Sequence, residues 1–198
     1  MGLTLVYADG QTPLDEAERE GLLIRIITTR EELDEHEQNN IQQAMLWLLS
    51  KKAAVNEILT EDFIRLLHVK MFGRVWRWAG EFRKTNKNIG VDKYEIPQQL
   101  RMLLDDCRYW IENKTYDGEE IAIRFKHRLV SIHCFANGNG RHSRLMADVI
   151  IERLFGKEVF SWGANDLGKK NDARGNYLAA LRAADRGDIS LWVAFARS

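Results

Sequence analysis

Cysteine and proline are scarce in this sequence, and neither sign of charge is in excess. With only two cysteines and two prolines among 198 residues, we expect neither a disulfide framework nor a proline-rich linker, and a reducing cytoplasm is the expected compartment. The 29 basic and 29 acidic residues cancel, so no net field draws the chain onto nucleic acid or an anionic membrane. These shortages exclude a disulfide-rich secreted scaffold and argue against nucleic acid or a membrane as a direct partner.

Long hydrophobic runs are also missing. No uninterrupted apolar stretch approaches the roughly 20 residues that a membrane-spanning helix needs. The first residues, MGLTLVYADGQT, have neither a basic start nor a long apolar run, so we expect no signal peptide. With 45% hydrophobic and 29% charged residues, the composition is typical of a soluble globular domain that is long enough to bury its own core.

Amphipathic patterns predict a mainly α-helical architecture. Residues 1–28 show no sustained period and are expected to form an irregular extension with a short strand at residues 3–7. The capping-box pattern Thr29-Arg-Glu-Glu32 then predicts a helix over residues 29–50. Further helices are expected after Thr60 and over residues 97–110, 119–132, 141–155, 174–185 and 190–196.

One segment has a β-like pattern. Between residues 81 and 96, apolar side chains are separated by Gly90 and two asparagines, and Pro97 closes the segment. This pattern predicts a β-hairpin or an extended flap.

The most informative stretch is HCFANGNGRHSR at residues 133–144. Its first residue, His133, is expected to end one helix, and a loop with two glycines leads into the next helix. Glycines allow consecutive amide donors to face one concavity, and the start of a helix adds unpaired N–H groups and a positive dipole end. The two arginines, Arg141 and Arg144, lie on one face of the first turn. Together these features predict a polyphosphate cradle, beside which a mostly neutral histidine can take a proton from a hydroxyl.

This stretch resembles the signature of the Fic (Fic/Doc) family, H-x-F-x-[D/E]-G-N-G-R-x-x-R, at every fixed position except 137. Residues 67–83 are similar to the family's segment before its target-docking flap, and residues 177–188 are similar to its C-terminal core helix. Within the family, the chain most resembles the small proteins called mobile mystery protein B. The resemblance implies a Fic-type helical bundle over residues 29–198, which transfers AMP from ATP to a Ser, Thr or Tyr hydroxyl of a target protein.

The resemblance also implies roles for single residues. His133 would be the catalytic base, and Phe135 would anchor the loop. Arg144 would hold the γ-phosphate end of ATP. The α- and β-phosphates would be contacted by Gly138, Asn139, Gly140 and Arg141. A flap that pairs with the target in β-strand fashion would be formed by Arg83, Lys84, Thr85, Asn86, Lys87, Asn88, Ile89, Gly90 and Val91. Composition alone favours a plain surface hairpin for the flap.

The departure at Asn137 concerns the metal ion. The family has Asp or Glu there to hold Mg²⁺, a cation that prefers charged oxygen ligands. An amide oxygen lacks that charge, so we expect weaker metal binding, with Mg²⁺ or Mn²⁺ recruited mainly by ATP.

Regulation and the alternative functions are less defined. No strict match to the family's inhibitory pattern [S/T]-x-x-x-E-[G/N] occurs. The nearest residue is Glu37, which would contact Arg144 from a regulatory helix or would simply lie on a solvated face.

Residues 163–170, GANDLGKK, resemble a P-loop but end in Lys instead of Ser or Thr, so a plain loop is expected. The alternatives to AMP transfer are a Fic-fold phosphotransferase and a weakly active nucleotide-binding protein that pairs with an antitoxin or regulator protein.

Overall fold

The structure is a computed structural model that describes residues 13–50, 55–163, 183, 184, 186 and 188–198. Its described helices are α1 (Glu16–Arg19), α2 (Arg30–Ser50), α3 (Val55–Ile58), α4 (Glu61–Phe72), α5 (Ile96–Glu112), α6 (Gly118–Ile132), α7 (Asn139–Phe155) and α9 (Ser190–Arg197). The prediction of a mainly helical architecture is confirmed. Among the described helices, none combines the length and hydropathy needed to span a bilayer.

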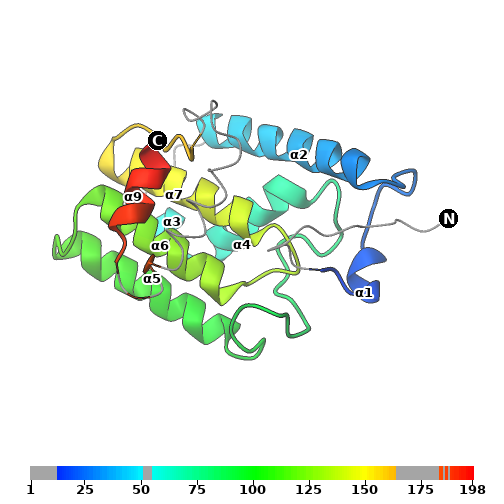
Figure 1. The fold of residues 1–198 in the computed structure, drawn as a ribbon, viewed down its shortest axis with the longest axis horizontal. Helices are drawn as coiled ribbons and strands as arrows, with labels where there is room; N and C mark the ends of the chain where they lie inside the picture. Colours follow the sequence, from blue (N-terminus) through cyan, green and yellow to red (C-terminus); the bar gives the residue numbers. More distant parts are fainter. Residues whose placement is uncertain (1–12, 51–54, 164–182, 185, 187) are drawn as a thin grey trace.

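Helices α6 and α7 form the centre of the bundle. α6 packs against both α7 and α5, whereas α2 packs on α4, which in turn contacts α7. Figure 1 shows α2 and α5 along opposite edges, with the other long helices between them. α6 buries apolar side chains on several sides, among them Ile121, Phe125 and Leu129, because it has helices on several sides. The loop between α6 and α7 therefore joins two helices that contribute many of the buried core residues.

Local sequence signals place the helix starts where they were expected. Glu32 accepts from the Thr29 N–H at 3.1 Å, and the Thr29 hydroxyl accepts from the Glu32 N–H at 3.2 Å, which confirms the capping box before α2. The Thr60 hydroxyl accepts from the Phe63 N–H at 3.1 Å and caps α4.

The N-terminal extension is more ordered than predicted in its described part. Residues 13–28 contain α1 and an antiparallel bridge between Leu22 and Trp76. The predicted strand at residues 3–7, the P-loop-like stretch after Gly163, and residues 174–182 of the predicted helix lie outside the described residues.

The predicted β-hairpin over residues 81–96 is wrong. This segment is an irregular loop up to the start of α5. Side chains replace the backbone pairs of a hairpin, because the Arg83 guanidinium donates to the Val91 carbonyl and the Asn86 amide oxygen accepts from the Lys93 N–H at 2.8 Å.

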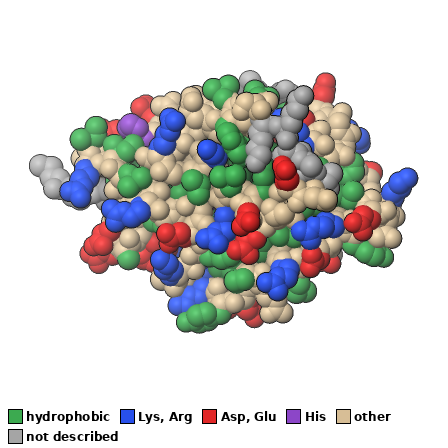
Figure 2. Space-filling model, turned by 180° about the vertical axis from the view of Figure 1, so that it is seen from behind, with side chains coloured by type: hydrophobic (Ala, Val, Ile, Leu, Met, Phe, Trp, Pro, Cys, Tyr) green, Lys and Arg blue, Asp and Glu red, His purple; other side chains and the backbone are tan. Residues whose placement is uncertain are grey.

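Charged side chains of both signs are mixed on one face of the molecule. Figure 2 shows Lys and Arg interspersed with Asp and Glu over the face opposite to that of Figure 1. This face offers no extended basic area of the kind that binds a nucleic-acid backbone.

Candidate active site at the loop between α6 and α7

The loop begins and ends with residues in left-handed backbone conformation. His133 ends α6 with a φ of 57°, and Gly138 precedes α7 with a φ of 79°. A Cβ atom at position 138 would lie 2.6 Å from the Phe72 ring, so only glycine fits there without displacing that ring. These two turns place His133 and the N-terminus of α7 on either side of one short loop.

The interior of the loop is braced by its own side chains. The amide of Asn139 accepts from the Phe135 N–H at 3.0 Å and donates to the Phe135 carbonyl at 2.8 Å. Phe135 is fully buried and stacks on His68, with ring centroids 3.8 Å apart. The Asn139 side chain therefore shapes the loop, and only its backbone N–H is left for a phosphate.

His68 is a structural part of the site that sequence reasoning missed. Its Nε2 lies 3.1 Å from the Asn137 carbonyl, and its Nδ1 accepts from the Gly80 N–H at 3.0 Å, which makes the ring a neutral donor toward the loop. Burial holds the pKa of His68 well below its usual value, and the neighbouring His142 lowers this pKa further. No spacing in the sequence signals this role, because His68 reaches the loop from α4.

Asn137 turns its side chain into the loop. Its amide oxygen accepts from the Gly138 N–H at 2.6 Å. Among the described residues, no group of three His, Cys, Asp or Glu side chains comes together to hold a metal ion. The Asn137 amide oxygen, which already accepts a hydrogen bond, does not fit a magnesium site built by the protein, because most such sites contain at least one carboxylate.

The two motif arginines differ in their contacts. Arg141 Nη1 pairs with Glu37 Oε2 at 2.7 Å, while Glu37 Oε1 accepts from the Trp76 indole N–H at 2.6 Å. The buried Nε of Arg144 has no hydrogen-bond partner within the described structure. The predicted contact of Glu37 with Arg144 is wrong; Trp76 fixes the glutamate beside the first turn of α7, where Arg141 emerges.

His133 is buried, with 4% of its surface exposed. Its pKa is lowered to about 4, first because burial disfavours the charged ring, and then because Arg83 and Lys87 add positive charge nearby. The imidazole is consequently neutral at pH 7, the state that a general base requires.

The flap residues divide into a buried anchor and an exposed loop. Arg83 is only 4% exposed, so it cannot be the target-docking residue predicted from the sequence. In contrast, residues 84–86 and 88–90 are exposed. Within the described structure, none of the backbone N–H groups of residues 84–90 donates a hydrogen bond, and they are open to pairing with another strand.

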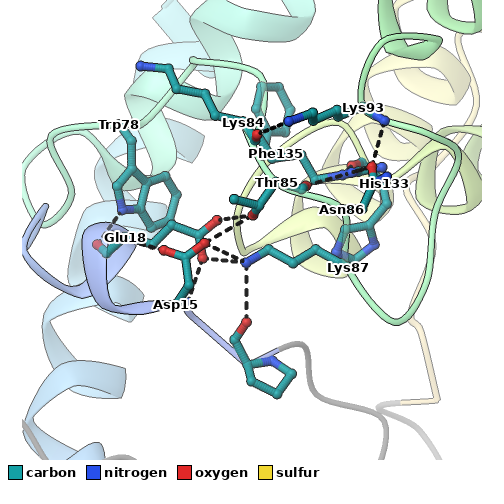
Figure 3. A network of polar contacts seen from close by, with 12 residues as sticks. Asp15, Glu18, Trp78, Lys84, Thr85, Asn86, Lys87, Lys93, His133 and Phe135 are labelled. Atoms are coloured by element: carbon teal, nitrogen blue, oxygen red, sulfur yellow. Dashed lines mark hydrogen bonds and ion pairs between the residues drawn. The ribbon is translucent and has the colours of Figure 1, made fainter.

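The N-terminal helix holds the flap from outside. In Figure 3 the Lys87 ammonium points toward α1, where it lies 2.5 Å from Glu18 Oε2 and 3.5 Å from Asp15 Oδ2. The Thr85 hydroxyl donates to Asp15 Oδ2 at 3.0 Å. Thr85 and Lys87, both predicted to dock a target, are thus occupied by acidic groups of the same chain.

Residues 58–151, which include the loop and the helices that hold it, match the sequence model of the Fic/DOC family. The chain carries a Fic/DOC domain. It is 26% identical over 195 residues to the protein adenylyltransferase Fic of Aedes aegypti and 26% identical to that of Drosophila melanogaster, with 96% of this chain covered in each case. The chain spans 38% of the length of these curated relatives.

Solved Fic structures share the fold. The chain aligns with Fic-1 (residues 134–508) of C. elegans at a TM-score of 0.64 and 24% identity, covering 80% of this chain and 46% of that one. It aligns with BepC of Bartonella tribocorum, solved with bound AMPPNP, at a TM-score of 0.68 and 17% identity, covering 92% of this chain and 97% of that one. At these identities the likeness concerns the fold.

Proposed function

We propose that this Fic-domain chain is a protein adenylyltransferase, which moves AMP from ATP onto a Ser, Thr or Tyr hydroxyl of a target protein. The observation that carries the proposal is a neutral, buried His133 next to a glycine loop and the N-terminus of α7. The adenylyltransferase names of the relatives, and the AMPPNP bound in BepC, support the same reaction.

The N-terminus of α7 would bind the phosphates. The first helical backbone hydrogen bond of α7 runs from the His142 N–H to the Gly138 carbonyl. The N–H groups of residues 139–141 precede this bond and therefore have no helical carbonyl as a partner. A Cβ atom at Gly140 would meet nothing within 4 Å, so open space lies beside that residue. These donors and the positive end of α7 suit the α- and β-phosphates, with Arg141 and Arg144 as further cationic contacts.

In the reaction, the target hydroxyl oxygen forms a bond to the α-phosphorus of ATP, and the bond from that phosphorus to the bridging oxygen of the β-phosphate breaks. The hydroxyl proton passes to His133, and pyrophosphate leaves with the electrons of the broken bond. Bound triphosphate would place negative charge near His133. This charge would raise the pKa of the imidazole from about 4 toward neutral pH and make it a stronger base.

The metal contribution would come with the nucleotide. Mg²⁺, or Mn²⁺ in its place, neutralises phosphate charge in reactions of this class. Because Asn137 provides no carboxylate and its amide oxygen already accepts from Gly138, we assign no catalytic step to a metal held by this chain.

The exposed flap would hold the target. Open N–H groups at residues 84–90 support strand-like pairing with a target segment, which would place its hydroxyl near His133. Glu37 would limit the reaction by occupying Arg141, a group needed by the phosphates. We place the reaction in a reducing cytoplasm, in keeping with the free, buried thiols of Cys107 and Cys134. An antitoxin or regulator protein stays a prediction from the sequence.

Separate incubations with α-labelled and γ-labelled ATP test the proposal. Adenylyl transfer predicts label on protein from α-labelled ATP alone, whereas a Fic-fold phosphotransferase would transfer only the γ-label. Absence of protein label from both nucleotides, with ATP binding intact, would contradict both reactions and favour a nucleotide-binding partner protein.

A further inference from the structure

Arg83 is a buried cation at the junction between the flap and the catalytic loop. Its Nε donates to the His133 carbonyl at 2.7 Å, and its Nη1 donates to the Thr85 carbonyl at 2.8 Å. Its Nη2 donates to the carbonyl of Val91, at the other end of the flap. Its backbone N–H also donates to the Cys134 carbonyl at 2.9 Å. One side chain thus connects both ends of the flap to the residue proposed as the base.

These three acceptors explain why an arginine is needed. A guanidinium presents five donors in a rigid planar fork, whereas a lysine ammonium is a single point that cannot reach carbonyls on three sides. The His133 carbonyl leaves α6 in a left-handed turn and has no following helical turn to bond. The bond from Arg83 therefore fixes the peptide unit that carries the imidazole.

The flap also touches His133 directly. Gly90 has a φ of 101°, and a Cβ atom there would lie 2.7 Å from the His133 Cβ and 2.9 Å from Arg83 Nη2. A side chain at position 90 would force the flap away from both residues. Glycine lets the flap backbone rest against the base.

We propose that Arg83 is a positioning residue, which sets the distance and register between a target segment docked on the flap and the imidazole of His133. The expected effect on catalysis rests on the proposed adenylyl transfer. The bonds by which Arg83 joins the flap to His133 are present in the protein without ligand. Buried Arg83 contacts the flap through its carbonyl groups, whereas Glu18 of α1 contacts it through the Lys87 side chain.

Two substitutions of Arg83 and one control separate positioning from folding. Arg83→Gln removes the fork and the charge, and Arg83→Lys keeps the charge without the fork. Arg65→Gln is the control, because Arg65 also donates to a backbone carbonyl, that of Gly80 at 2.9 Å, without touching His133.

We expect Arg83→Gln to reduce transfer of α-labelled AMP through kcat by about 10²-fold, as a displaced reacting group does. Arg83→Lys should recover part of this loss. ATP affinity measured by calorimetry should stay within about twofold of the parent in all three variants, since the Arg83 side chain bonds the carbonyls of His133, Thr85 and Val91 and not the N–H groups of residues 139–141. Equal transfer by Arg83→Gln and Arg65→Gln, or a parallel loss of ATP affinity in Arg83→Gln, would overturn the proposal.

Two readouts do not depend on activity. The N–H groups of Val91 and Lys93, at the end of the flap, donate to the Ile132 carbonyl and to the Asn86 amide oxygen, and their exchange should accelerate in both Arg83 variants and not in the Arg65 control. The pKa of His133, followed by NMR, should rise in Arg83→Gln and stay low in Arg83→Lys, with Lys87 as the other cation acting on the ring. Unchanged amide exchange in the flap, together with an unchanged His133 pKa, would refute the coupling, and this test needs no activity. A parent protein that transfers no AMP would refute the proposed function instead.

Gly90→Ala tests the same contact from the flap if Arg83→Gln does not fold. The added methyl group should displace the flap, lower transfer through kcat and shift the His133 resonances. Full activity with unshifted resonances would show that the flap and the base are independent.

Discussion

Glu37 on α2 and Arg141 on α7 form an ion pair of 2.7 Å at the N-terminal turn of α7. The glutamate side chain is 3% exposed and is oriented by the Trp76 indole, whereas the arginine is 32% exposed. The pair therefore neutralises one of the two arginines that we propose to bind ATP.

Replacing Glu37 with Gln should raise AMP transfer. The amide oxygen of Gln can still accept from Trp76, so the substitution removes the charge with little change of shape, and Arg141 becomes free for phosphate. We expect a gain of about tenfold in ATP affinity, the size of one charge-assisted contact, measured by calorimetry and by labelled-AMP transfer. Glu35→Gln, on the exposed side of the same helix, is the matched control. Equal affinity and activity in the parent and Glu37→Gln would return Glu37 to a structural role.

Replacing His133 with Ala should abolish transfer and leave ATP binding nearly intact, because the imidazole acts on the hydroxyl and not on the phosphates. Loss of a general base typically reduces the rate by about 10²–10⁴-fold. Label transfer is compared with calorimetric ATP affinity. An Ala variant that transfers label at the parental rate would show that another group takes the proton.

Replacing Arg141 or Arg144 with Ala should weaken ATP binding. Each charge-assisted bond contributes about 1.5–3 kcal/mol, which corresponds to roughly tenfold or more in Kd. Because Arg141 must first leave Glu37, its deletion should have the smaller effect of the two in the parent and a larger effect in a Glu37→Gln background. Calorimetry that finds unchanged affinity in both single variants would rule out the phosphate cradle.

Replacing Asn137 with Asp should lower the Mg²⁺ concentration needed for half-maximal transfer. The carboxylate keeps an acceptor for the Gly138 N–H and adds the negative charge that magnesium prefers. The parent should work better with Mn²⁺, which binds mixed nitrogen and oxygen sites more tightly. A metal titration is run beside Asn113→Asp, an exposed position at the end of α5 that receives the same charge. If the parent already saturates at low Mg²⁺ and Asn137→Asp is no better, position 137 does not bear on the metal.

Acid should destabilise the protein below about pH 6.5. Burial lowers the pKa of His142 from 6.5 to about 4, and the pKa values of His68 and His133 are lowered as well. Between pH 6.5 and 4 the unfolded chain binds protons that the folded one rejects, so stability falls with the pH by up to about 1.4 kcal/mol per pH unit for each histidine. Asp148 opposes this trend, because its raised pKa of about 6 lets the folded state bind a proton first.

Urea unfolding at pH 7 and pH 5 measures the effect. His142→Gln keeps a donor for the Ile64 carbonyl, which lies 3.0 Å from His142 Nε2, and removes one titrating ring. Its free energy of unfolding should change less between the two pH values than that of the parent. An identical loss in both proteins would show that His142 does not titrate on unfolding.

The local sequence alone determined most of the described helices and the loop that we propose to carry the chemistry. Helical periodicity and capping residues depend on neighbours within a few positions, which is why the starts of α2 and α4 were predictable. The stretch from His133 to Arg144 is likewise continuous, so its glycines, histidine and arginines are placed together by the chain itself. The pattern of residues 81–96 was misleading, because Gly90 and alternating apolar residues also suit a loop whose carbonyls bond to side chains.

Tertiary structure decided which distant groups act on that loop. Glu37 meets Arg141 instead of Arg144, and His68 bonds the Asn137 carbonyl from α4. Arg83, which resembles an exposed docking residue in the sequence, is buried under its own flap. Each of these outcomes depends on burial and on partners tens of residues away, and a periodicity of a few residues carries no information about either. The histidine proposed as the base could therefore be located from the sequence, whereas its low pKa and its bond from Arg83 depend on how the helices pack.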